Sequence, residues 1–290
     1  MNQEEVEKFN TTEDAVFSTQ QCRAPSLPFK LGEPTQKSAD ELQLNDIAPR
    51  AYHVTRMMDG TSCTVAIHCS VDKEDLDDVF AVVPVEIADD DGVFGCAFTN
   101  FYADLHVCTK SMDLKVKLDE GEEPDNVYTK AILPMWPEFR RIIAETGSQF
   151  VEDKNVVFVF RGEICGQGVN ASSVNKDAVG EPTFHLFETY VLDGKTNEML
   201  TYHDDFFESD TARSRLFAPL NPCERIETVL LMTEENVTDL LNKYRNAPAE
   251  DGKGVVLWEM SLAIEACLTG FSFKVKSNEY AQGVDVYECR

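Results

Sequence analysis

The sequence predicts an α+β fold with antiparallel sheets and a few helices. From residue 51 onward, Val, Phe, Tyr and Cys alternate roughly with polar residues, as expected of half-buried strands. Helical spacing is confined to a few segments, and the strands lack the regular intervening helices that a parallel sheet requires. Hydrophobic residues make up 43% of the 290-residue chain, which is ample for a core.

The expected strands share this alternation and are separated by acidic turns. They lie at 51–58, 62–71, 79–87, 92–107, 155–169, 183–194, 225–232, 254–262 and 270–280. The acidic turns 72–78, 89–92 and 119–126 are interpreted as solvated loops rather than metal sites.

Two helices are expected between these strands. Residues 129–147 show helical spacing, with two prolines that indicate a late start or a kink. Residues 233–245 form the second, with Thr233 as the N-cap. Residues 1–45 are polar and are expected to form an N-terminal surface extension, partly helical near 3–9 and with a short capped turn at 38–44. The folded domain is expected over 46–290.

Charge and cysteine content restrict the class of protein. The formal net charge of −26 argues against broad, nonspecific binding of polyanions, although a local basic groove remains compatible with it. Nine cysteines without a CxxC pair indicate reduced, buried thiols in a cytoplasmic compartment. The sequence contains no run of 18 apolar residues, so no membrane span is predicted.

Five short segments carry the chemistry by their order and spacing. They are HVTRMMDGTSCTVAIH (53–68), FRGEICGQGV (160–169), FHLFETYV (184–191), GKGVVLW (252–258) and FSFKVKSNEY (271–280). The set resembles the motifs of the ATP-dependent RNA ligases within the covalent nucleotidyltransferase superfamily, and it covers roughly residues 50–280. The resemblance implies an α+β, RNA ligase-like nucleotidyltransferase (ATP-grasp-like) fold over 46–290, with two antiparallel sheets, flanking helices and a central groove.

The resemblance also implies roles for individual residues. Phe187 would stack on adenine, and Glu163 would accept hydrogen bonds from the ribose hydroxyls. Lys274 and Lys276 alternate on one strand, so both can face one triphosphate. The remaining nucleotide-binding positions implied are Thr55, Asp59 and Gly60. ATP and Mg²⁺ are the implied ligands, although no metal-ligating residue is assigned.

Three positions depart from the family pattern. Met57 occupies the place of the nucleophilic lysine, and a thioether cannot form a lysyl-AMP. Lys253 stands where the fourth motif carries a glutamate. The arginine expected on a strand after the first motif is missing, because no Arg lies between Arg56 and Arg140. A lysine-to-methionine change made to trap substrate would alter only the first position, so the pattern favours a naturally degenerate site.

The sequence therefore predicts an RNA-binding protein on an RNA ligase fold, without self-adenylation. Arg56, Lys115, Lys117 and Arg161 are the candidate RNA-binding residues. One alternative is an ATP-dependent RNA ligase whose first step is disabled by Met57. Another is a structural or protein-binding module, which the acidic composition favours. RNA, ATP and protein are thus the partners considered, with no membrane, in the cytoplasm of a host cell if the protein is viral or from a phage.

Overall fold

The computed structural model describes most of the chain in ten segments. These are residues 17–23, 37–43, 47–87, 97–109, 112–118, 126–169, 177–202, 211–248, 252–260 and 272–281. The chain divides into two compact units. Unit 1 comprises Met1–Leu31, Ser62–Gly162 and Glu188–His203, and unit 2 comprises Gly32–Thr61, Glu163–Phe187 and Asp204–Arg290.

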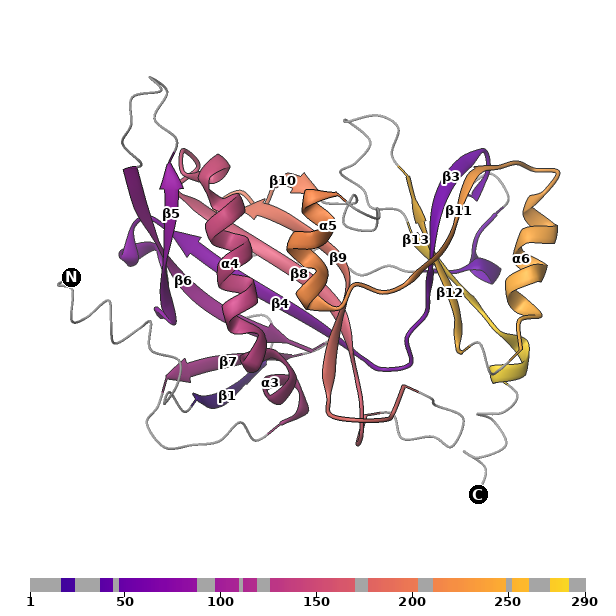
Figure 1. Cartoon of the computed structure of the whole chain (residues 1–290), viewed down its shortest axis with the longest axis horizontal. Helices are drawn as coiled ribbons and strands as arrows, with labels where there is room; N and C mark the ends of the chain where they lie inside the picture. The colour runs from indigo at the N-terminus through magenta and orange to yellow at the C-terminus, as the bar shows by residue number, and fades with distance from the viewer. Residues whose placement is uncertain are drawn as a thin grey trace. The chain divides into compact units, whose positions relative to one another are not determined.

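The larger sheet has eight strands in the order β1-β7-β6-β4-β8-β9-β10, with β5 pairing to β6 (Figure 1). Its strands are β1 (Phe17–Arg23), β4 (Thr61–Ser70), β5 (Ala81–Ile87), β6 (Ala97–Cys108), β7 (Met112–Leu118), β8 (Asn155–Cys165), β9 (Thr183–Asp193) and β10 (Met199–Tyr202). The β1–β7, β4–β6, β5–β6, β6–β7 and β9–β10 pairs are antiparallel.

The smaller sheet has five strands in the order β11-β3-β12-β13-β2. They are β2 (Lys37–Ser38), β3 (Arg50–Arg56), β11 (Arg225–Met232), β12 (Gly254–Glu259) and β13 (Ser272–Lys276). The short β2 pairs in parallel with β13, and the other pairs are antiparallel. The prediction of an α+β protein with antiparallel sheets is confirmed, whereas the groove predicted between them stays a prediction.

In unit 1, the single helix predicted over 129–147 is divided into two. Helix α3 (Val127–Ile132), capped by the Asn126 side chain, leads through the 3₁₀ turn η3 (Leu133–Met135) into α4 (Trp136–Thr146). A proline in the first turn of η3 and of α4 removes a donor that a continuous helix would use. Helix α4 ends at Gly147, where the 3₁₀ turn η4 (Gly147–Phe150) begins.

Aromatic side chains join α4 to the rest of unit 1. Trp136 meets Phe80 edge to face at 4.9 Å between ring centroids, and Phe139 lies 4.9 Å from Phe160 of β8. Trp136, Phe139 and Phe160 are buried, so this face of α4 forms part of the hydrophobic core.

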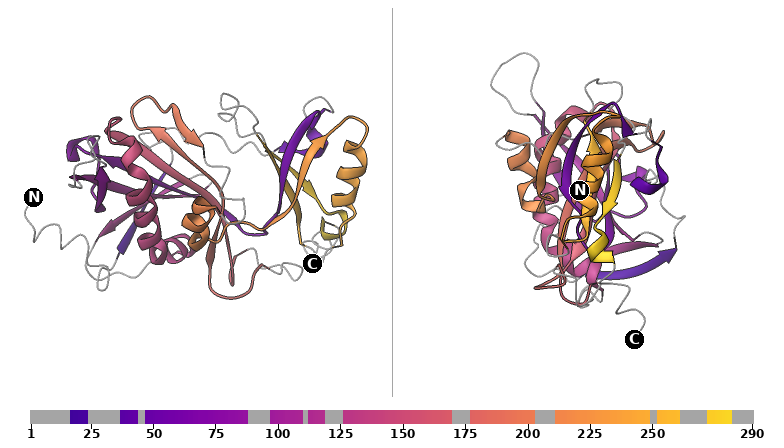
Figure 2. Two further views of the ribbon diagram at one scale, coloured as in Figure 1. Left: turned by 45° about the horizontal axis from the view of Figure 1, so that its top comes forward. Right: turned by 90° about the vertical axis from the view of Figure 1, so that its right-hand side faces the viewer.

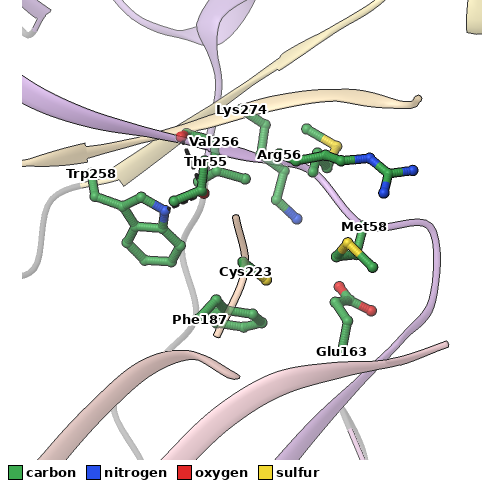
Figure 3. Close-up of a pocket in the computed structure, with 10 residues that line it drawn as sticks. Thr55, Arg56, Met58, Glu163, Phe187, Cys223, Val256, Trp258 and Lys274 are labelled. Carbon is green, nitrogen blue, oxygen red and sulfur yellow. Dashed lines mark hydrogen bonds between the residues drawn. The ribbon is translucent and has the colours of Figure 1, made fainter. Parts of the chain in front are cut away.

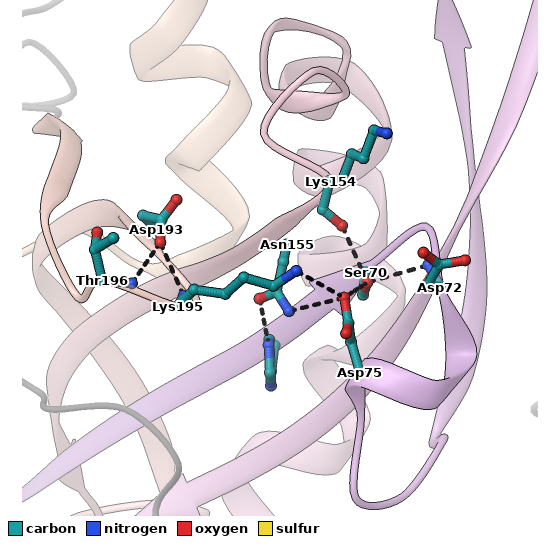
Figure 4. A network of polar contacts seen from close by, with 9 residues as sticks. Ser70, Asp72, Asp75, Lys154, Asn155, Asp193, Lys195 and Thr196 are labelled. Carbon is teal, nitrogen blue, oxygen red and sulfur yellow. Dashed lines mark hydrogen bonds and ion pairs between the residues drawn. The ribbon is translucent and has the colours of Figure 1, made fainter.

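A polar network ties several loops of unit 1 together (Figure 4). Asn155 donates from Nδ2 to the Asp75 carboxylate at 3.2 Å, and Ser70 donates to the same carboxylate at 3.1 Å. His68 lies 2.7 Å from the Asn155 amide oxygen. Asp75 sits in the 3₁₀ turn η2 (Lys73–Asp75), so the network fixes this acidic turn in place.

In unit 2, helix α6 (Val237–Arg245) packs on one face of the smaller sheet (Figures 1 and 2). The buried side chains of this core come from β3, β12, β13 and α6, and include Tyr52, Val54, Leu257, Phe273, Val237, Leu241 and Tyr244. The predicted helix start is wrong by several residues: Thr233 caps a preceding turn through its hydroxyl and carbonyl, and α6 begins at Val237.

Unit 2 also contains the short helices η1 (Ala39–Glu41), α5 (Ala212–Phe217) and η6 (Ala218–Leu220). Ser38 and Glu41 form a capping box on η1, which confirms the capped turn predicted at 38–44. The helix predicted near 3–9 lies outside the described residues.

The described cysteines Cys63, Cys69, Cys108, Cys165 and Cys223 are free and buried, as predicted. Within the described segments, no helix has the length and apolar character needed to cross a membrane.

Candidate functional site

The two faces of the smaller sheet have different compositions. Tyr52 and Val54 of β3 point into the core against α6, so Thr55 lies on the opposite face because side chains alternate along a strand. Val256 pairs in register with Thr55 on one side and with Lys274 on the other. Opposed residues on neighbouring antiparallel strands share a face. Thr55, Val256 and Lys274 therefore lie together on the face away from α6.

This face forms one wall of a pocket within unit 2 (Figure 3). The pocket has an empty volume of about 300 Å³, which includes open solvent. The residues that line it are Thr55, Arg56, Met57, Met58, Glu163, Phe187, Cys223, Val256, Trp258 and Lys274. Figure 3 shows the Lys274 ammonium group pointing into this space, whereas the Arg56 guanidinium is directed away from the other lining side chains.

One end of the pocket is apolar and aromatic. Met57, Val256 and Trp258 form a buried cluster, with Phe187 packed against it. The Phe187 and Trp258 rings stack with centroids 5.6 Å apart and planes at 27°. The Trp258 indole N–H donates to the Thr55 hydroxyl at 2.8 Å, which fixes the orientation of the indole. This end offers flat apolar surface to a planar ligand.

Glu163 is the acidic group of the pocket. Its Oε2 atom is buried and has no hydrogen-bond partner among the residues that the structure describes. Burial raises the pKa of Glu163 to about 7, against the opposing effects of Lys274 and Lys253. A buried polar oxygen without a partner is uncommon in proteins, and a ligand hydroxyl would satisfy it. By contrast, burial raises the pKa of the Cys223 thiol to about 12, so Cys223 contributes a neutral surface.

The turn after β3 holds the predicted Asp-Gly pair. Asp59 is nearly buried, and its carboxylate accepts hydrogen bonds from Lys253 Nζ at 2.8 Å and from the Tyr280 hydroxyl. A Cβ atom on Gly60 would lie 2.3 Å from the Ile164 carbonyl oxygen, so only glycine fits there. Asp59 thus anchors the turn, and Lys253 is its ion-pair partner.

A second ion pair lies beside this turn. Arg56 Nη2 donates to Asp177 Oδ1 at 2.8 Å, and the Asp59 backbone N–H donates to Asp177 Oδ2 at 2.9 Å. A Cβ atom on Gly252 would lie 3.2 Å from Arg56 Nε, so the residue preceding Lys253 approaches the guanidinium closely. The Arg56 guanidinium and the backbone just before Lys253 therefore lie close together beside the turn.

The structure brings together most of the residues singled out from the sequence. Thr55, Arg56, Met57, Glu163, Phe187 and Lys274 line the pocket. Asp59 and Gly60 form the adjoining turn, whereas Lys276 is exposed and does not line the pocket.

Three candidate RNA-binding residues belong to unit 1, whereas the pocket residues belong to unit 2. Arg161 is buried and forms an ion pair with buried Glu188, so its guanidinium is engaged inside the protein. Its contact with RNA stays a prediction. Lys115 and Lys117 belong to β7, and their side chains lie outside what the structure describes.

Four pocket residues were missed by the sequence argument: Met58, Cys223, Val256 and Trp258. Val256 and Trp258 could have been found, because period-two alternation places them on one face of the strand that holds the GKGVVLW motif. Cys223 follows a loop and had no such signal. It reaches the pocket because its backbone N–H binds the Leu186 carbonyl at 2.8 Å, next to Phe187.

Comparison with known proteins gives matches among solved structures alone. No protein-family model and no curated protein matches the sequence. An RNA ligase from Naegleria gruberi, solved with pyrophosphate, aligns at 18% identity and a TM-score of 0.46. An alanine variant of that ligase with ATP and Mn aligns at 19% identity and a TM-score of 0.47. These alignments cover 92% and 91% of this chain but only 60% and 59% of the ligase chains.

Proposed function

We propose that this protein binds RNA by holding a ribonucleotide in the unit 2 pocket, and that it does not transfer AMP to itself. The observation that carries this proposal is the place of Met57. It is 5% exposed, lines the pocket and packs with Val256 and Trp258. A thioether there offers apolar surface but no amine to attack a phosphorus atom.

The other pocket groups suit a ribonucleotide. Phe187 is partly exposed and stacks on the buried Trp258 ring, so its outer face is the aromatic surface offered to a base. Stacking contributes about 1–3 kcal/mol per base in proteins that bind single strands. Glu163 presents to a ribose hydroxyl a buried oxygen that has no hydrogen-bond partner among the described residues. Lys274 points an ammonium group into the pocket, where it would attract a phosphate (Figure 3).

The test is binding of a short fluorescent RNA with a 5′-phosphate, followed by anisotropy. We expect binding that weakens with salt and that ATP displaces, because both ligands would use one pocket. Lys274→Met should weaken binding about tenfold, as expected for a charge-assisted contact. Lys243→Met is the matched control, since Lys243 is exposed on α6 and pairs with Glu227. No anisotropy change at low salt would contradict the proposal.

A second candidate function is an RNA ligase disabled at its first step. The observation that favours it is that Met57 already lines the pocket, so a lysine at this position would place an amine there. The discriminating measurement is transfer of radiolabelled AMP from ATP to Met57→Lys. We expect no label, because Lys253 occupies the position of the fourth-motif acid. A labelled Met57→Lys protein would instead support the disabled ligase.

A further inference from the structure

The carboxylates beside the pocket are already engaged by protein groups. Asp59 accepts from Lys253 at 2.8 Å through Oδ1 and from the Tyr280 hydroxyl through Oδ2. Asp177 accepts from Arg56 at 2.8 Å through Oδ1 and from the Asp59 N–H at 2.9 Å through Oδ2. All four oxygens thus have a donor within the protein.

Carboxylates that are engaged in this way do not fit the Mg²⁺ that the family resemblance implies. Mg²⁺ at nucleotide sites is usually held by one or two carboxylates together with phosphate and water oxygens. Asp59 and Asp177 are both engaged by cationic side chains. Glu163 Oε2 has no hydrogen-bond partner among the described residues, but it lies in a pocket that Lys274 also lines.

Both the backbone and the side chain of Lys253 are held in place beside the pocket. Its carbonyl accepts from the Ser277 N–H at 3.0 Å, and the carbonyl of the next residue, Gly254, accepts from the Met57 N–H at 2.9 Å. Its backbone therefore bridges β13 and the end of β3. The Lys253 side chain is 31% exposed, so its ammonium group can reach a ligand while it remains paired with Asp59.

Three protein cations lie in or beside the pocket. Lys274 and Arg56 line it, and Lys253 pairs with Asp59 on the turn that follows the pocket residues Met57 and Met58. Lys274 and Lys253 both lower the pKa of Glu163, which agrees with this placement. A phosphate attracts such a cluster of ammonium and guanidinium groups directly.

We propose that Lys253, together with Arg56 and Lys274, binds the phosphate of the ribonucleotide and takes the place of a divalent cation, so that the pocket binds nucleotide without metal. This inference rests on the proposed function, because it assumes that the pocket holds a ribonucleotide. It assigns to Lys253 a phosphate-binding role in addition to its pairing with Asp59.

The test is calorimetric titration of ATP into the full chain, once with EDTA and once with Mg²⁺. We expect the same dissociation constant within about twofold in both buffers. Lys253→Met should lose about tenfold in affinity in both buffers, as expected for a lost charge-assisted contact. Lys253→Glu should bind weakly in EDTA and regain affinity with Mg²⁺, because a second carboxylate beside Asp59 creates a cation site.

A separate titration of Mn²⁺ alone checks the metal site without nucleotide. The wild-type protein should show no saturable Mn²⁺ binding, and Lys253→Glu should acquire it. Lys243→Met is the control for loss of a unit 2 charge outside the pocket, and thermal melting confirms that each variant is folded.

The outcomes separate the two proposals. Binding of ATP by the wild type only when Mg²⁺ is present, or saturable Mn²⁺ binding by the wild type, overturns the metal-free site but leaves the proposed function standing. Absence of ATP binding in both buffers, together with absence of RNA binding, overturns both. An unchanged ATP affinity in Lys253→Met overturns the role of Lys253.

Discussion

His106 in unit 1 and Glu163 in unit 2 are both removed from water, but their surroundings differ. His106 is fully buried on β6, with its ring nitrogens 3.0 Å from Asp113 and 3.2 Å from Asp104. Glu163 keeps one buried oxygen without a partner among the described residues. A buried charge surrounded by its own partners contributes to the fold, whereas an unpaired buried oxygen beside a pocket is available to a ligand.

The same contrast extends to the cations. In unit 1, Arg161 is buried against Glu188, so a residue that looked basic and accessible in the sequence is part of the interior. In unit 2, Arg56 pairs with Asp177 and Lys253 with Asp59, but these two cations and Lys274 are each partly accessible. Basic residues should therefore be judged by whether they stay accessible once paired, and the following variants test that difference.

The largest effect is expected from Asp113→Ala. It leaves His106 without one of its two carboxylates, and breaking a buried ion pair costs about 3–5 kcal/mol of the free energy of unfolding. Urea denaturation measures this loss. Glu152→Ala, an exposed acidic control in unit 1, should change the free energy by less than about 0.5 kcal/mol. Equal losses in the two variants would remove the distinction between paired and solvated acids.

In contrast to Asp113→Ala, Glu163→Gln should weaken ligand binding without destabilising the fold. We expect about a tenfold loss of ATP affinity, because the amide replaces a charged acceptor with a neutral one. At pH values above the Glu163 pKa of about 7, the free energy of unfolding should stay constant or rise, since a buried charge is removed. Calorimetry and urea denaturation on the same preparation test both. A destabilised variant with normal ATP affinity would assign Glu163 to the fold instead.

The pH dependence of stability separates the two residues further. Burial raises the pKa of Glu163 from 4.5 to about 7, so the native state binds more protons there and stability falls as pH rises through that window. For His106, burial lowers the pKa, but hydrogen bonds to Asp104 and Asp113 outweigh it and raise the pKa from 6.5 to about 9. The contribution of His106 to the free energy of unfolding is therefore complete below pH 6.5 and is lost as pH rises through about 9.

Denaturation curves collected across pH for wild type and Glu163→Gln measure these windows. The variant should reduce the decline between 4.5 and 7 and leave the decline between 6.5 and 9 unchanged. A variant curve parallel to the wild type throughout would show that Glu163 titrates normally.

The smallest effect is expected from Lys243→Met. Lys243 is 55% exposed and pairs with Glu227 on the surface of unit 2, and such pairs contribute about 0–1 kcal/mol. Unfolding and RNA-binding measurements should both stay close to wild type. A loss of RNA affinity comparable to that of Lys274→Met would indicate that α6, rather than the pocket, contacts RNA.

Much of the site follows from local order in the sequence. Alternation along β3, β12 and β13 is enough to place Thr55 with Met57, Val256 with Trp258, and Lys274 with Lys276 on common faces. The Asp-Gly pair predicts the turn, and Ser38 with Glu41 predicts the capped η1. These features depend on residues within one strand or turn, so the sequence alone determines them.

Other features depend on partners that are distant in the sequence. Lys253 is the partner of Asp59, 194 residues away, and no local pattern connects them. Tertiary packing also buries Arg161 against Glu188, brings Cys223 to the pocket, and leaves Lys276 exposed while its neighbour on the same face, Lys274, points inward. The sequence determined which groups share a face, whereas the tertiary structure decided which charged groups are buried and which stay partly accessible, because burial and pairing depend on the surrounding chain.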